Sequence, residues 1–185
     1  EAVASGHTGT KAAFHVQRTL GPGESCVLHT RLTPHRPEHP FADFDATLEE
    51  RRNDADTYYA SLQEGIDSAD DRRIQRQALA GMIWTKQFYY WDVSEWLEGD
   101  PAQPKPPESR KYRRNADWDH LNNADILSMP DAWEYPWYAS WDTAFHCLPL
   151  ALVDPAFAKS QLDLLTREWY MHPNGQLPAY EWELD

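Results

Sequence analysis

The 185-residue sequence has only two cysteines, and it has no long apolar run. Cys26 and Cys147 are too few and too far apart to form a disulfide framework, which favours a reducing compartment. No stretch of about 18 apolar residues is present, so we expect no membrane-spanning segment. Because no charged and then apolar leader opens the chain, we expect a cytoplasmic location, although a chain that begins at Glu1 leaves a lost leader possible.

Positive charge is also scarce. The chain has 17 Lys and Arg against 30 Asp and Glu, a formal net charge of −13. Affinity for nucleic acid comes largely from clustered Lys and Arg, so this composition argues against a nucleic-acid partner.

Tryptophan is absent from the first 83 residues, and all nine lie between Trp84 and Trp182. This asymmetry indicates two kinds of structure. The segment "TKAAFHVQRTLGPGESCVLHTRLTP", residues 10–34, reads as two extended runs joined by "GPGE", with apolar residues alternating through Phe14 and Val16 and then Cys26 and Leu28, which predicts a β-hairpin. Because a lone hairpin is marginal in water, we expect its strands to belong to a sheet with members outside this chain. The proline-rich "TPHRPEHPF" that follows predicts an exposed linker.

Two helices follow the linker. Thr47 with Glu50 fits a capping box, and Ser68 with Asp71 predicts a second helix start in the same way. We expect the second helix to reach about Lys86. The next stretch, "QFYYWDVSEWLEGDP", fits a strand by composition and a helix by spacing, and "DPAQPKPP" predicts a surface loop.

The strongest helix signal starts at Asp154, a good N-cap followed by Pro155. Its expected apolar stripe is Ala158, Leu162, Leu165 and Trp169. Residues 140–153 predict the partner helix of an αα-hairpin, bent or broken near Pro149.

Residues 135–146, "YPWYASWDTAFH", crowd aromatic rings around one carboxylate. Flat rings beside carboxylates suit a sugar, whose apolar faces stack and whose hydroxyls donate hydrogen bonds. The motif "YEWELD" has the same character. In the alternative interpretation, Trp141 and Phe145 are neighbours in the core, and Asp142 only interacts with a helix dipole. The candidate substrate-binding residues are Trp137, Tyr138, Trp141, Asp142, Tyr180, Glu181 and Trp182.

Other motifs are weaker. The acids of "RNADWDHLNNAD" lack the glycine and final Glu of a calcium loop, so a hydrogen-bonded loop facing a pocket is favoured. His120, His146 and His172 lack metal-ligand spacing, and we expect no metal and no cofactor. "RKYRRN" is short and lies near many acids, which favours a solvated ion-pair surface.

Four stretches, "GTKAAFHVQRTLGPGESCVLHTRLTP", "QRQALAGMIWTKQFYYWDV..WLEGDP", "RNADWDHLNNADILSMPDAWEYPWYASWDTAFHCLPLALVDP" and "REWYMHPNGQLPAYEW", resemble the bacterial branch of glycoside hydrolase family 63. The resemblance implies a mainly α fold: the first helical hairpins of an (α/α)6 barrel, preceded by terminal strands of a β-sandwich. It implies a sandwich part over residues 1–33, a linker and linker helix over 34–67, and barrel over 68–185.

The same resemblance implies an inverting α-glycosidase of the α-glucosidase or α-mannosidase type, acting on a glycoside or small oligosaccharide. The chain would be a fragment that packs against the rest of its own polypeptide, with the catalytic acid and base beyond Asp185. Trp141 and Asp142 match the family's sugar-holding element, and the loop from Gln176 to Trp182 matches a segment lining the same pocket. The alternative is a non-catalytic carbohydrate-binding protein, because a fold alone does not fix function.

Overall fold

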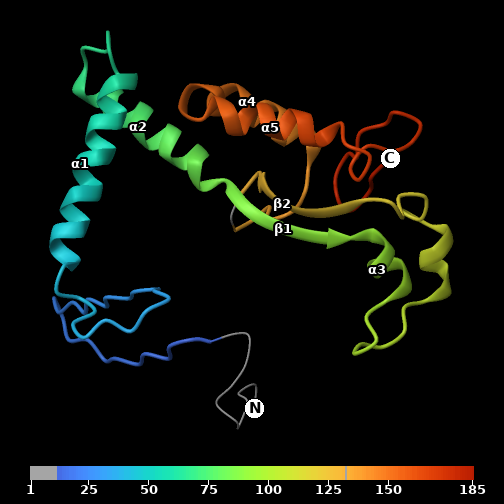
Figure 1. The fold of residues 1–185 in the computed structure, drawn as a ribbon, viewed down its shortest axis with the longest axis horizontal. Helices are drawn as coiled ribbons and strands as arrows, with labels where there is room; N and C mark the ends of the chain where they lie inside the picture. The colour runs from blue at the N-terminus through green and yellow to red at the C-terminus, as the bar shows by residue number, and fades with distance from the viewer. Residues whose placement is uncertain (1–11, 132) are drawn as a thin grey trace. The chain divides into compact units, whose positions relative to one another are not determined.

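The computed structural model describes residues 12–131 and 133–185 (Figure 1). The chain divides into two compact units, one ending at Asp54 and one beginning at Ala55. None of the described helices combines the length and apolar content needed to cross a bilayer. The expected boundaries after residues 33 and 67 stay predictions.

In the first unit, residues 12–43 form no helix or strand. Arg31 donates to both carboxylate oxygens of Asp43, at 2.8 and 2.9 Å, and to the carbonyl of Pro40 at 2.6 Å. The ring of His29 stacks on Phe44 at 3.9 Å between centroids. The β-hairpin predicted for residues 10–34 is therefore wrong over residues 12–34, which form no strand, and residues 10 and 11 lie outside the described residues. Two strands without a further partner are marginal in water.

The first two elements of secondary structure are helices. Helix α1 spans Phe44–Leu62, so it starts before the predicted capping box at Thr47. Helix α2 spans Ala69–Trp84, and its N-cap is Ser68, whose hydroxyl accepts from the Asp71 amide at 3.2 Å. The predicted start of α2 is confirmed because a cap depends only on local sequence.

A two-stranded antiparallel sheet follows. Strand β1, Lys86–Asp92, pairs with β2, Asn122–Ser128, and Lys86 lies opposite Ser128. The stretch "QFYYWDVSEWLEGDP", for which strand and helix were both possible, contains one of each. Its first part belongs to strand β1, and helix α3, Val93–Glu98, follows directly. The loop predicted for "RNADWDHLNNAD" is wrong over its last residues, which belong to β2.

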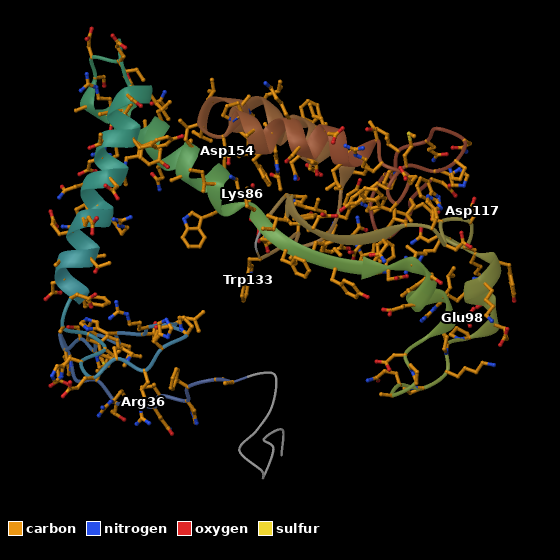
Figure 2. The ribbon with its side chains drawn as sticks, in the orientation of Figure 1. Arg36, Lys86, Glu98, Asp117, Trp133 and Asp154 are labelled. Atoms are coloured by element: carbon orange, nitrogen blue, oxygen red, sulfur yellow. The ribbon has the colours of Figure 1, made fainter. Side chains whose placement is uncertain are left out.

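The helices α4, Ser140–Val153, and α5, Pro155–Leu165, lie side by side (Figure 1). Asp154 separates them and caps α5 by accepting from the Phe157 amide at 3.0 Å, which confirms the predicted hairpin. Its carboxylate also accepts from Lys86 Nζ at 2.6 Å, and both side chains are labelled in Figure 2. Helix α4 continues through Pro149, so the predicted break is absent.

Gln161 joins α5 to the sheet. Its side-chain amide donates to the Ile126 carbonyl at 3.0 Å and accepts from the Ser128 amide at 3.0 Å. A carbonyl and the amide two residues later point to the same edge of a strand, so Gln161 occupies the place of a further strand. In the predicted stripe of α5, Ala158 and Leu165 are buried, but Leu162 is 47% exposed.

The core of the second unit consists of three clusters. One joins α3 to the last residues through Val93, Leu97, Trp118, Leu121 and Leu184. The second joins the sheet to α5 through Leu127, Met129, Tyr138, Leu165 and Tyr170. The third joins α4 to α5 through Cys147, Leu150 and Ala158.

The fold class expected from the resemblance is wrong. The described residues form five α-helices, the short 3₁₀ helix η1 at Glu108–Tyr112 and one two-stranded sheet, a small mixed α/β arrangement. Helix α5 packs mainly against α4, and Gln161 and Leu165 join it to the sheet, so these helices do not form a ring of helical hairpins. In residues 86–92 and 122–128, the backbone N–H and C=O groups form hydrogen bonds between two strands. In the predicted barrel they would bond within helices.

Candidate functional site

The two aromatic segments predicted to hold a ligand lie next to each other. Ala139 and Tyr180 form an isolated antiparallel bridge, and the Ser140 amide donates to the Ala179 carbonyl at 2.8 Å. These contacts bring the start of α4 against residues about forty positions later in the chain.

A tight turn follows the bridge. The amide of Glu183 donates to the Tyr180 carbonyl at 3.0 Å, and the Tyr180 amide donates back to Glu183 at 3.3 Å. Glu181 and Trp182 occupy the tip of this turn. Backbone bonds hold the turn, so its course does not depend on the side chains of Glu181 and Trp182.

The side chain of Asn115 also holds this turn in place. It is buried, donates to the Glu181 carbonyl at 2.8 Å and accepts from the Leu184 amide at 3.0 Å. The backbone of Asn115 is left-handed, with φ of 63°, a conformation that asparagine tolerates better than most residues. The preceding Arg114 lies with its guanidinium 5.3 Å from the centre of a Trp182 ring.

Rings pair across the bridge. Trp141 lies 5.5 Å from Tyr180, and Trp137 lies 6.2 Å from Trp182, between centroids. Of the seven predicted site residues, these four therefore form two contacting pairs. Trp141 and Trp182 are about half exposed, as a stacking surface requires.

Glu181 and Trp182 open onto a groove of about 460 Å³. We call it the aromatic groove, and its lining residues are Tyr89, Tyr90, Trp91, Trp96, Arg114, Pro136, Glu181 and Trp182. Among these described lining residues, Glu181 alone carries a carboxylate.

The hydroxyl of Tyr89 donates to Glu181 Oε2. Burial, and then this hydrogen bond to a carboxylate, raise the pKa of Tyr89 well above its usual value. Tyr89 therefore keeps its proton and acts as the donor. Within the described residues the second carboxylate oxygen of Glu181 has no hydrogen-bond partner, which leaves it available to accept from a ligand hydroxyl.

Of the seven predicted residues, only Glu181 and Trp182 line the aromatic groove, and Trp137, Trp141 and Tyr180 are outside its lining. The last two, Tyr138 and Asp142, also lie elsewhere. Tyr138 is 1% exposed and belongs to the core, and its buried hydroxyl has no partner among the described residues. Asp142 is half-buried in the first turn of α4, outside the lining of the aromatic groove. Its charge acts on His146, where it opposes the effect of burial, which lowers the pKa of that imidazole. A ligand contact by Asp142 stays a prediction.

The site residues that the sequence did not reveal are the other lining residues of the groove, Tyr89, Tyr90, Trp91, Trp96, Arg114 and Pro136, and the supporting residue Asn115. Tyr89 lies in the stretch with two possible assignments, and a firm strand assignment would have put it on the face opposite Phe88 and Tyr90. Arg114 and Asn115 belong to "RKYRRN", whose interpretation as an ion-pair surface is wrong for Arg114, because that side chain contacts an indole and no carboxylate within the described residues. Only spatial proximity reveals their roles.

No group of three or more metal-ligating side chains occurs in residues 12–131 and 133–185. The site therefore offers ring faces, one carboxylate and one guanidinium. Such a set can bind a ligand by stacking and hydrogen bonding.

The chain is similar to the uncharacterized protein YMR196W of Saccharomyces cerevisiae, with 47% identity over 197 aligned positions. The alignment covers the whole of this chain but 18% of the yeast protein's length. No protein-family model matches the chain. No solved structure matches it either.

Proposed function

We propose that this chain is part of a carbohydrate-active protein, an inverting α-glycosidase of the α-glucosidase or α-mannosidase type, in which the aromatic groove holds a sugar of a glycoside or small oligosaccharide. The observation that supports this most is Glu181, held by Tyr89 and beside the exposed ring of Trp182. A sugar can stack its apolar face on the indole while its hydroxyls donate to the carboxylate.

The role of Glu181 in this proposal is to orient the sugar. An inverting glycosidase needs two carboxyl groups about 6.5 to 9.5 Å apart, one as acid and one as base. Because Glu181 is the single carboxylate among the described lining residues of the groove, the acid and base would be other groups. A single carboxylate equally suits the second candidate, a non-catalytic carbohydrate-binding protein.

The test is sugar binding by the intact protein and by matched tryptophan variants. A screen of neutral glucosides and mannosides, read by calorimetry, should identify a ligand. Trp182→Ala should then weaken its binding by about tenfold or more, since stacking on the ring is lost. Trp84→Ala is the control, because Trp84 is 80% exposed and lies outside the groove. Equal affinities for the two variants would contradict the proposal.

Glu181→Gln tests the carboxylate separately. The amide oxygen can still accept from Tyr89, but charge-assisted bonds to sugar hydroxyls are lost. We expect weaker binding with an unchanged melting temperature. Release of a reducing sugar by the intact protein would decide for the enzyme over the non-catalytic candidate.

A further inference from the structure

A second pocket, next to the aromatic groove, carries concentrated positive charge. It has a volume of about 410 Å³. We call it the arginine pocket, and its lining residues are Trp96, Pro107, Ser109, Arg110, Arg113 and Arg114. These described residues include three guanidinium groups and no carboxylate.

No carboxylate among the described residues pairs with the arginines of this pocket. Arg113 and Arg114 form no ion pair with any carboxylate in the part of the chain that the structure describes. Arg110 donates to the carbonyl of Trp96 at 2.6 Å, a neutral partner. In a chain with net charge −13, most cations can find a carboxylate nearby. A cluster that lacks one is suited to an external anion.

Two indoles support the arginines. The guanidinium of Arg110 lies 4.5 Å from a Trp96 ring centre, and that of Arg114 lies 5.3 Å from Trp182. Contact between a guanidinium plane and an aromatic face leaves the N–H groups at the edge of the plane free. Those edges can donate to the oxygens of an anion in the bidentate manner typical of arginine.

The arginine pocket adjoins the aromatic groove, since Trp96 and Arg114 line both. Asn115, directly after Arg114, bonds to the main chain of Glu181 and Leu184. This link fixes the cationic side of the site relative to the carboxylate side. One ligand can therefore reach both parts.

We propose that the arginine pocket binds the phosphate group of a phosphorylated carbohydrate whose sugar ring lies in the aromatic groove. The sugar half of this proposal rests on the proposed function, whereas the phosphate half rests on the pocket alone. A phosphate monoester carries a charge of about −1.5 to −2 and three acceptor oxygens. Three guanidinium groups and the Ser109 hydroxyl match it better than they match a carboxylate, which has one charge and two oxygens.

Calorimetry on the intact protein tests this with inorganic phosphate, glucose 6-phosphate, glucose and gluconate. We expect inorganic phosphate to bind, and glucose 6-phosphate to bind more tightly than glucose or gluconate. The double variant Arg113→Gln and Arg114→Gln should weaken phosphate binding by about tenfold or more, since charge-assisted bonds are lost. Both side chains are exposed, so a melting curve should show the fold retained.

Lys111→Gln is the matched control. It removes a neighbouring positive charge, but Lys111 faces Glu98 at 4.0 Å and does not line the pocket. Its phosphate affinity should stay within about twofold of the original. A loss as large as that of the double arginine variant would show a general charge effect and overturn the proposal.

The remaining outcomes are also decisive. Failure of inorganic phosphate and of glucose 6-phosphate to bind would overturn the arginine pocket as a phosphate site. Gluconate binding as tightly as glucose 6-phosphate would overturn the choice of phosphate. Phosphate binding that depends on the arginines, together with no affinity for any neutral sugar, would sustain the pocket and refute the proposed function alone.

Discussion

Asn115 is the residue on which the geometry of the site depends most directly. It is 1% exposed, and its amide group satisfies one donor and one acceptor of the Tyr180–Leu184 segment. A buried polar group that loses its partner costs about 1 to 3 kcal/mol. The orientation of Glu181 and Trp182 is therefore coupled to one side chain some seventy residues earlier.

We expect Asn115→Gly to destabilise the protein by about 2 kcal/mol or more. Glycine tolerates the left-handed backbone, so the variant removes the side-chain bonds without adding strain. Chemical denaturation measures the change. Asn174→Gly is the control, because Asn174 makes its bond to Gln176 in an exposed turn. An equal effect of both substitutions would show that the bonds of Asn115 contribute nothing specific.

His146 should give the protein a dependence of stability on pH. Burial lowers the pKa of its imidazole from the usual 6.5, and Ser128 and Asp142 only partly oppose this. The unfolded chain therefore takes up a proton at a higher pH than the folded protein does. The resulting contribution to stability is complete above pH 6.5 and is lost as the pH falls toward the folded pKa.

The corresponding prediction is that His146→Gln flattens the profile of unfolding free energy between about pH 7 and pH 5. Asp142→Asn should steepen the same profile, because it removes the carboxylate that raises the pKa of His146. Urea denaturation at a series of pH values measures both. A histidine variant with the original slope would assign the dependence to other groups.

At the scale of elements, α5 is held to the sheet by Gln161 as well as by apolar packing. Gln161 bonds both the Ile126 carbonyl and the Ser128 amide, and it is 3% exposed. A polar residue on a predicted helix face reads as solvent-facing from sequence alone. The position turns inward here because the free edge of β2 needs a donor and an acceptor.

We predict that Gln161→Glu destabilises the protein by about 1 to 3 kcal/mol, since a carboxylate cannot donate to the Ile126 carbonyl and would be buried with its charge. Gln161→Met should also destabilise, by leaving two backbone groups without partners. Thermal unfolding measures both. Gln103→Glu, in the exposed loop after α3, provides a control that should be close to neutral.

Local signals predicted elements better than pairing signals did. The caps Ser68 and Asp154 lie where the sequence indicates, because a cap requires only residues within one turn. The strand at residues 122–128 was missed, since its paired residues are thirty or more positions away and its polar start resembles a loop. Continuity of α4 through Pro149 was missed because neighbouring packing outweighs the local preference.

At the scale of the whole molecule, the family resemblance implied that the segment with Trp141 and Asp142 lies near the loop from Gln176 to Trp182, and the structure brings these segments together. The rings of Trp137 and Trp141 do pair with those of Trp182 and Tyr180. Both Asp142 and Glu181 were predicted to orient a sugar, and of the two only Glu181 lines the aromatic groove. The aromatic composition indicates that the protein has an aromatic surface, but only the fold determines which carboxylate lies beside it.

One prediction belongs to this scale. We expect the 185-residue chain, produced by itself, to hydrolyse no aryl α-glycoside, because the described lining of its groove offers one carboxylate and inversion needs two. A chromogenic glycoside assay with mass-spectrometric detection of products measures this. Clear turnover that Glu181→Gln abolishes would contradict the orienting role given to Glu181.

The turn from Tyr180 to Glu183 has a consequence for how specificity can change. Main-chain bonds and the Asn115 side chain hold its course, and none of these bonds uses the side chains at the tip. Substitutions at positions 181 and 182 therefore leave the scaffold's own supports in place. The ligand specificity of such a turn can change by substitution of these two residues alone. Related proteins or a designed library could therefore bind new ligands with the same backbone conformation.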